Sequence, residues 1–244
     1  MAPRASGGLT AGRHVATGTA PATDARDNVA SHRIAESLRT AILDGSYRPG
    51  ERIRQEDVAA RSGASRIPVR EALRMLAAEG LVTLVANSGA WVTRLTMAEC
   101  TETYLIRERL EPLLLRTSMP RLGEAETGRL AELTEAMEAA GTDVDAFLRA
   151  DREFHLSSYA GAAPGETWQI IHRMWNTTQH YRREFTKRAV RGESGGGLDV
   201  THLEHRLLLD CVRRQDPDDA ERVLVTHIRR TRLELGKHPE IFAP

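Results

Sequence analysis

Apolar residues recur at the spacing of an α-helix along most of the chain, and at the spacing of a β-strand in one short region. Before residue 96 the pattern predicts three helices and then two extended pieces that a turn signal joins. The helices are Asn28–Leu43, Gln55 to about Arg61 and the segment between Ser65 and Gly80, and the extended pieces are Leu81–Val85 and Ala90–Val92. Helix, tight turn, helix and hairpin together predict a winged helix-turn-helix.

Local signals mark the ends of the third of these helices. Gly63 breaks the helix before it, because glycine adopts the positive φ that a tight turn needs. Ser65 is positioned to cap the next helix with its hydroxyl, and Pro68 falls in the first turn, where a missing N–H costs nothing. The apolar stripe of this helix comprises Val69, Leu73 and Leu76. Gly80 then ends the helix.

Arginines occupy the opposite face of the same helix. Arg66 and Arg70 are four residues apart and therefore neighbours in the first turns, and Arg74 continues that face. A recognition helix enters the major groove with its N-terminus first, and arginine binds guanine edges or phosphates there. The alternative is an ordinary helix with a solvated basic face. The spacing of the arginines does not by itself distinguish the two interpretations.

From residue 96 onward every periodic segment predicts a helix. Thr96 and Glu99 form a capping-box signal at the start of this region. Six helices follow: Met97–Met119, Glu124–Ala140, Val144–Tyr159, Thr167–Val190, Leu198–Arg214 and Pro217–Gly236. Glycine or proline marks the segments between them, except for Gln215-Asp216 before the last helix. Six amphipathic helices form a bundle with one core. The predicted fold class is therefore mainly α, with an N-terminal winged helix-turn-helix and a C-terminal all-α six-helix bundle.

Polar side chains fall on apolar faces of this predicted bundle. Asp151 and His155 are four residues apart on a face that carries phenylalanine and leucine, so they project together toward the core. His205 and His227 lie among apolar residues of the last two helices. Because an isolated buried carboxylate is costly, Asp151 needs a cation or a metal. Three imidazoles and one carboxylate suit a divalent transition metal such as zinc, nickel or manganese.

Each of these residues has a structural alternative. A single histidine on a half-apolar helix is more often a hydrogen-bonded core residue than a ligand. Asp151 could instead pair with Arg107 or Arg173, and His202 could point inward in place of His205. The spacing leaves these alternatives open.

Composition and charge limit the partners. The formal net charge is +0, so any affinity for nucleic acid must come from a local patch. Residues 29–94 carry ten Arg against seven Asp and Glu, a modest excess that fits a protein needing two copies to hold DNA. The two cysteines suggest neither a disulfide framework nor a CxxC site. No apolar run approaches the roughly 20 residues that span a bilayer, so we expect a cytoplasmic protein with no membrane partner.

The predicted organisation has four parts. Residues 1–27 are rich in Ala, Gly and Thr and lack the apolar region of a secretory signal, which predicts a disordered tail or an arm that touches DNA phosphates. Residues 28–95 form the winged helix-turn-helix and residues 96–238 the helical bundle. Residues 239–244 are expected to be a short tail.

The first domain resembles the DNA-binding domain of the GntR family of bacterial transcription regulators. The residues that carry the resemblance are Tyr47-Arg48-Pro49-Gly50-Glu51, Ser65-Arg66-Ile67-Pro68-Val69-Arg70-Glu71-Ala72-Leu73, Glu79-Gly80-Leu81-Val82 and the wing glycine Gly89. Members of the family usually have Thr where this chain has Ile67. The resemblance implies that a double-stranded DNA operator is contacted by Ser65, Arg66, Arg70 and Arg74 and by the wing residues Asn87 and Gly89.

The second domain resembles the FCD ligand-binding domain of the FadR subfamily of GntR regulators. The matching pieces are Arg107-Glu108-Arg109-Leu110-Glu111-Pro112, Asp151-Arg152-Glu153-Phe154-His155, Glu204-His205-Arg206-Leu207-Leu208 and Asp216-Pro217-Asp218-Asp219-Ala220-Glu221, leading to His227-Ile228. The resemblance implies metal ligation by Asp151, His155, His205 and His227, with His205 preferred over His202. It favours zinc, and six helices resemble the VanR-type branch.

The same resemblance implies a small carboxylic-acid or sugar-acid effector. We expect Arg107 and Asn176 to bind it, with His172 and Arg182 as further candidates for the cavity lining. Arg107 could instead form a structural ion pair with Asp151 or Glu111. The expected function is that of a homodimeric regulator, most simply a repressor, on a palindromic operator. We expect no catalytic residues and no enzyme, and the alternatives are a metal sensor or a metal-dependent hydrolase.

Overall fold

Helix α3 (Arg66–Ala78) is the centre of the N-terminal unit in the computed structural model, which describes residues 22–86, 88–193 and 196–243. Its apolar stripe is fully buried, as the spacing predicts, and packs on α1 (Ala22–Leu43) and α2 (Gln55–Ser62). Gly63 has φ 62° in the turn between α2 and α3. The turn therefore forms as the glycine predicts.

The wing is a small antiparallel sheet. Strands β2 (Val82–Val85) and β3 (Gly89–Val92) form the predicted hairpin, with Val82 opposite Val92 and Leu84 opposite Ala90. Strand β1 (Arg52–Ile53) adds to the other edge, so the order is β1-β3-β2. Ala90 and Val92 face the core of the unit, which explains the alternation seen in the sequence. The winged helix-turn-helix is therefore confirmed.

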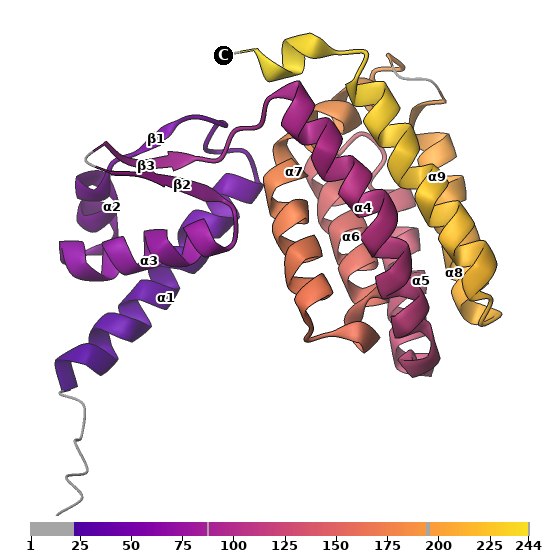
Figure 1. Ribbon diagram of the computed structural model, residues 1–244, viewed down its shortest axis with the longest axis horizontal. Helices are drawn as coiled ribbons and strands as arrows, with labels where there is room; N and C mark the ends of the chain where they lie inside the picture. Colours follow the sequence, from indigo (N-terminus) through magenta and orange to yellow (C-terminus); the bar gives the residue numbers. More distant parts are fainter. Residues whose placement is uncertain (1–21, 87, 194–195, 244) are drawn as a thin grey trace, which may run out of the picture.

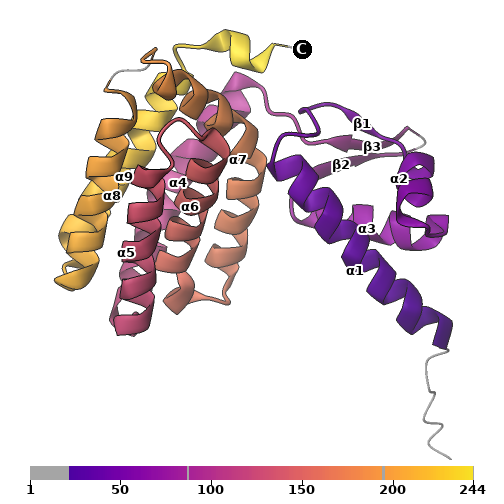
Figure 2. The same ribbon diagram turned by 180° about the vertical axis from the view of Figure 1, so that it is seen from behind.

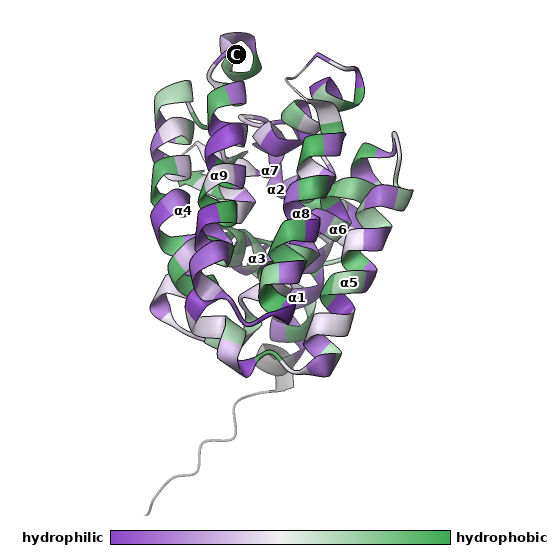
Figure 3. Cartoon of the chain, turned by 90° about the vertical axis from the view of Figure 1, so that its right-hand side faces the viewer, coloured by the Kyte–Doolittle hydropathy of each residue, from purple (hydrophilic) through white to green (hydrophobic). Residues whose placement is uncertain are grey.

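In the part of the C-terminal domain that the structure describes, six α-helices form a bundle, and each predicted end lies within one residue of the observed one. They are α4 (Met97–Ser118), α5 (Glu124–Ala139), α6 (Val144–Ser158), α7 (Glu166–Val190), α8 (Gly197–Arg213) and α9 (Pro217–Leu235). Hydrophilic and hydrophobic residues alternate along these helices (Figure 3), and the apolar ones form one continuous core. Two 3₁₀ turns, η1 (Met119–Arg121) and η2 (Ala160–Ala162), lie at helix ends.

Capping follows the sequence at one helix and departs from it at another. The hydroxyl of Thr96 accepts from the Glu99 backbone N–H, and the Glu99 carboxylate accepts from the Thr96 N–H, which completes the predicted capping box of α4. Ser65 is the N-cap residue of α3, but its hydroxyl makes no capping hydrogen bond, so that part of the prediction is wrong. Ser65 instead stays exposed at the tip of α3.

Both predicted tails differ from the structure. Helix α1 begins at Ala22, six residues before the predicted Asn28, because a helix continues beyond the residues whose apolar faces reveal it. The rest of the predicted tail lies outside the described residues. At the other end, Pro239–Phe242 forms a 3₁₀ turn, η3, and the Phe242 ring stacks on Tyr181 with 4.8 Å between centroids. Residues 239–243 are therefore docked on the bundle.

Helix α7 is the bundle helix nearest the N-terminal unit (Figures 1 and 2). The Asn176 amide donates to the Glu79 carbonyl at the end of α3 (3.0 Å), and Arg183 donates to the Leu43 carbonyl at the end of α1 (3.1 Å). The Tyr181 hydroxyl accepts from the Leu95 N–H (2.6 Å) and donates to the Leu95 carbonyl (2.8 Å). One helix thus fixes α1, α3 and the connection between the two domains.

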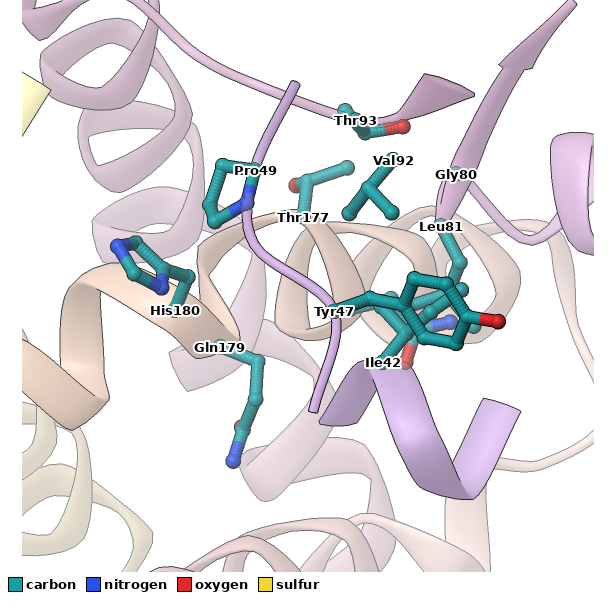
Figure 4. A pocket seen from close by; sticks show the side chains of 11 residues that line it. Ile42, Tyr47, Pro49, Gly80, Leu81, Val92, Thr93, Thr177, Gln179 and His180 are labelled. Atoms are coloured by element: carbon teal, nitrogen blue, oxygen red, sulfur yellow. The ribbon is translucent and has the colours of Figure 1, made fainter. Parts of the chain in front are cut away.

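The two units meet in a narrow pocket beside α7. Figure 4 shows side chains of the loop after α1, among them Tyr47 and Pro49, near Thr177 and His180 of α7. Gly80 lies at the back of this junction with φ 79°, and a Cβ there would lie 2.7 Å from Cγ of Arg173. The junction therefore requires glycine for its backbone conformation and for its close approach.

Among the described residues, none of the helices combines the length and the apolar character needed to cross a lipid bilayer.

Candidate metal centre and DNA-reading helix

Four buried side chains converge inside the bundle. Helix α6 supplies Asp151 and His155, α8 supplies His205 and α9 supplies His227, and one ligand atom of each lies within 4.8 Å of all the others. Nε2 of His205 is 3.1 Å from Oδ1 of Asp151 and 3.2 Å from Nε2 of His155. His205 rather than His202 points inward, since the His202 ring lies against Phe147 instead. The structure thus brings the four predicted ligands together.

The other ring nitrogen of each histidine is held by an acceptor. Nδ1 of His205 is 2.7 Å from the Thr201 carbonyl oxygen, and Nδ1 of His227 is 2.7 Å from Oε2 of Glu204. Nδ1 of His155 is 3.3 Å from the hydroxyl of Tyr159, which donates its own proton to Glu111 (2.7 Å) and so accepts from the ring. Each neutral imidazole therefore carries its proton on Nδ1.

It follows that three unprotonated Nε2 atoms and a carboxylate face one another. Burial lowers the pKa of His205 and of His227 to about 4, and burial and the two neighbouring histidines lower the pKa of His155 well below its usual value. The three rings are thus neutral at physiological pH and supply lone pairs. Lone pairs directed at one point in a dry interior repel unless a cation lies between them, so the donor set fits a divalent metal.

Arg182 of α7 completes the environment of Asp151. Its guanidinium pairs with Oδ2 of Asp151, which leaves Oδ1 facing the histidines. The sequence had suggested Arg107 or Arg173 as the partner of Asp151, but the partner is Arg182. Burial and the nearby Arg107 lower the pKa of Arg182 to about 9, so it stays charged at neutral pH. Its guanidinium lies 3.9 Å from the centre of the Trp175 ring, and that ring is 5.1 Å from the ring of His155.

Arg107 lies on the other side of this arrangement. Its guanidinium is 4.6 Å from the centre of the Trp175 ring and pairs with Glu111 on the same helix. It also donates to the Thr178 hydroxyl at 3.3 Å. Burial opposes the charge of Arg107, but Glu111 outweighs burial and raises its pKa. The sequence had offered Asp151 or Glu111 as the partner of a structural Arg107, and the structure shows the pair with Glu111.

Asn176 does not face the metal cluster. Its amide nitrogen donates to the Glu79 carbonyl and its amide oxygen accepts from Arg152, so both ends are engaged at the domain junction. The prediction that Asn176 binds an effector is therefore replaced by a role between domains. His172 stacks on Trp168, 4.9 Å between ring centroids, away from the four converging side chains.

The carboxylates next in sequence to the ligands are occupied by other partners. Glu204 accepts from His227 and from Arg230; burial raises its pKa, but these bonds outweigh burial and lower the pKa to about 2. Glu153 pairs with Arg129 at the surface. Neither carboxylate is therefore placed to act as a general base at the cluster. No sequence pattern reveals that Glu204 supports a ligand of the next helix, since the two residues meet only in the folded bundle.

The other candidate surface is the exposed face of α3. Arg66, Arg70 and Arg74 are all exposed, on the face opposite the buried stripe, as predicted. Arg66 lies 3.4 Å from Glu56 and Arg74 lies 3.1 Å from Glu71, both at the surface. Ion pairs of this kind contribute little and exchange easily for phosphates. Three cations along the exposed face of α3 suit the electronegative groove of DNA.

The remaining residues predicted to touch DNA flank this face. Ser65 is exposed at the start of α3 and Gly89 is half-buried at the start of β3, while Asn87 lies outside the described residues. The structure adds one residue that the sequence had not proposed for contact. Ile67 is 65% exposed in the first turn of α3, beside Arg66.

Two known protein families match the two domains. The family model "Bacterial regulatory proteins, gntR family" matches residues 30–92, and that of the FCD domain matches residues 102–230. The chain therefore belongs to the GntR family of bacterial regulatory proteins, and its FCD domain indicates the FadR-like subfamily. It is a DNA-binding transcriptional regulator.

Individual relatives agree with this assignment. The HTH-type transcriptional regulator YdhC of Bacillus subtilis (strain 168) is 35% identical over 194 residues, which cover 78% of this chain and 84% of YdhC. A probable D-xylose utilization operon transcriptional repressor of Paenarthrobacter nicotinovorans is 30% identical over 206 residues, covering 83% and 87% of the two chains. The crystal structure of a GntR regulator from Rhodococcus sp. RHA1 has the same fold, with a TM-score of 0.70 at 24% identity over 85% of this chain and 97% of that one.

Proposed function

We propose that the protein is a repressor that binds a palindromic operator as a homodimer and responds to a small organic or sugar acid at a metal site. The observation that carries the proposal is the convergence of three unprotonated Nε2 atoms and one carboxylate inside an FCD domain. The name of the Paenarthrobacter relative, a probable transcriptional repressor of a D-xylose utilization operon, supports repression as the direction of regulation.

The residues that would hold the metal are Asp151, His155, His205 and His227, and zinc is the first candidate, with nickel or manganese as alternatives. A bound divalent ion would supply positive charge, and an open coordination position, for a carboxylate. The chain's own part is to fix the four ligands. Thr201, Tyr159 and Glu204 hold the rings in the tautomer that exposes Nε2.

Arg182 is the best candidate to recognise the effector. It is a buried guanidinium that pairs with Oδ2 of Asp151, and a planar carboxylate of an effector matches it equally well. Arg107 lies near the same Trp175 ring and would bind a second acidic group of a larger effector. An apolar face of Trp175 between two guanidiniums suits the carbon skeleton of a small acid.

Helix α7 would transmit the response. It carries Arg182 and Trp175 near the metal cluster, and it carries Asn176 and Arg183 at the junction with α3 and α1. An effector that draws Arg182 away from Asp151 would shift α7, and with it the recognition helix. A difference in effector affinity of about 1–3 kcal/mol between two states is enough for regulation.

Binding to the promoter of its own gene, measured by a gel shift, tests the DNA-binding assignment. We expect the Arg66→Ala, Arg70→Ala double variant to lose most operator affinity, since both side chains are exposed and the core does not need them. Arg191→Ala removes an exposed arginine of the bundle and is the matched control. Unchanged operator binding by the double variant would refute the assignment of the reading helix.

Elemental analysis of the purified protein tests the metal site. We expect about one divalent ion per chain, and none in a His205→Ala, His227→Ala variant. Full metal occupancy in that variant would rule out the proposed ligand set. A metal sensor, the second candidate, would instead show exchangeable metal whose addition alone changes operator affinity.

A further inference from the structure

A second cavity lies between the domains, away from the metal cluster. It has a volume of about 280 Å³, close to the lower end of the roughly 300–1,000 Å³ typical of ligand sites. Its walls come from the end of α1 and from α6 and α7, and the lining includes Leu43, Leu148, Arg149, Arg152, Gln179 and Arg183. No part of the proposed effector site lines this cavity.

The lining carries more positive than negative charge. Asp145 is paired with Arg183, and Asp44 accepts from the backbone N–H and the hydroxyl of Ser46. Arg149 and Arg152 are three residues apart on one face of α6, and within the described part of the chain neither has an ion-pair partner. Two arginines and one aspartate of the lining thus lack ion-pair partners among the described residues, which leaves the cavity a net positive charge.

Arg152 provides the strongest indication that an anion binds in this cavity. Its Nη2 donates to the amide oxygen of Asn176, a neutral acceptor, and its Nη1 is buried with no hydrogen-bond partner among the described residues. A buried N–H without a partner is costly, and an oxyanion that draws the Arg152 guanidinium toward the adjacent cavity would remove that cost.

We propose that this interdomain cavity is a second ligand site, which binds a small metabolite through a carboxylate or phosphate group held by Arg152 and Arg149. The planar fork of arginine matches either oxyanion, while Leu43 and Leu148 accommodate carbon. Gln179 also lines this cavity, and its amide oxygen accepts a hydrogen bond from Arg182 at 3.1 Å. Gln179 therefore connects the cavity to the proposed effector site beside the metal cluster.

The site also touches the DNA-binding unit. Arg152 holds Asn176, and Asn176 holds the Glu79 carbonyl at the end of α3. An anion that draws Arg152 into the cavity weakens that chain of contacts. The bound anion therefore changes operator affinity, and this part of the inference rests on the proposed function.

Calorimetric titration of the full-length protein with succinate and with inorganic phosphate tests the site. A saturable binding event should remain in the metal-ligand variant His227→Ala, weaken at least tenfold in Arg152→Gln and Arg149→Gln, and stay unchanged in the control Arg191→Gln. Arg149 is exposed, so its variant gives an answer even if Arg152→Gln fails to fold. Binding of one anion but not the other identifies the oxyanion that the site takes.

Two results would overturn the inference: neither anion binds the His227→Ala variant, or both arginine variants bind as the wild type does. Operator affinity is measured in the same samples by gel shift. Saturating anion should change it about fivefold in the wild type and leave it unchanged in Asn176→Ala. If the anion binds the cavity and wild-type operator affinity does not move, the site exists but its coupling to α3 is refuted.

Discussion

Ile67 stands at the tip of the recognition helix without any role in the core. It is 65% exposed and lies between two exposed arginines on the face that would enter the major groove. Arginine reads hydrogen-bonding groups there, whereas an apolar side chain reads only the methyl group of thymine. The residue thus adds a different kind of recognition to the same face.

Replacing Ile67 by Thr, the residue usual in the family, should change base preference without changing stability. We expect operators with thymine at the contacted position to bind about fivefold more weakly, since roughly one buried methylene's worth of contact is lost. The measurement is a set of operators in which each A·T pair is altered in turn. An identical preference profile for the two proteins would show that Ile67 does not contact a base.

Glu204 should matter for metal binding although it is not a ligand. It accepts from Nδ1 of His227 at 2.7 Å and so fixes that ring. In Glu204→Gln the fixed acceptor becomes a weaker one, and we expect metal affinity to fall about 10- to 100-fold in a chelator competition assay. Glu138→Gln is the matched control, because Glu138 pairs with Arg206 at the surface. Equal losses in the two variants would contradict the role of Glu204.

At the level of elements, helix ends were predictable because their causes are local. The turn at Gly63 and the capping box of Thr96 with Glu99 each act within a few residues. The start of α1 and the docking of η3 were not predictable in the same way. Docking of η3 depends on Tyr181, which is distant in the sequence and which no local pattern reveals as its partner.

In the candidate metal site too, the features with local causes were predictable from the sequence and those that depend on distant residues were not. Asp151 and His155 were predictable as neighbours because four residues make about one turn. His205 and His227 were candidates from their apolar surroundings, but the choice of His205 over His202 required the family resemblance. The pairing of Asp151 with Arg182 and of Asn176 with Glu79 was not predictable. Both depend on how α7 is rotated against its neighbours, which side-chain spacing within one helix does not determine.

Two glycines allow two effects on the free energy of unfolding to be measured separately. One is the strain of a positive φ in a residue with a side chain, and the other is the steric clash of a Cβ with a neighbouring helix. Gly63 has φ 62°, and a Cβ added there would meet no atom within 4 Å, whereas Gly80 has φ 79° and lies against Arg173 and Thr177 of α7. We expect Gly63→Ala to lower the free energy of unfolding by about 1 kcal/mol and Gly80→Ala by at least about 1 kcal/mol more. Denaturant unfolding measures both. Equal losses of unfolding free energy in the two variants would mean that Arg173 and Thr177 of α7 move aside at no measurable cost.

For the whole molecule, the metal should act as a link between helices distant in the sequence. The proposed ligands come from α6, α8 and α9, so removing a bound ion would free three elements at once. A ligand present at about 1,000 times its Kd stabilises by roughly 4 kcal/mol, so chelation should lower the Tm of the bundle by on the order of 10 °C. The variant His205→Ala, His227→Ala should not respond to chelator. A chelator-insensitive wild type would contradict a bound structural ion.

The hydroxyl of Tyr181 holds both the N–H and the carbonyl of Leu95, so the connection between the domains is not a free tether. An exchange of sensor domains between regulators of this kind would naturally cut the chain at such a connection. Here a functional chimaera would have to keep the face of α7 that contacts the DNA-binding unit together with the connection around Leu95. Under the proposed function, helix α7 carries both Arg182, which would recognise the effector, and the contacts to the DNA-binding unit, so the two would have to be exchanged together.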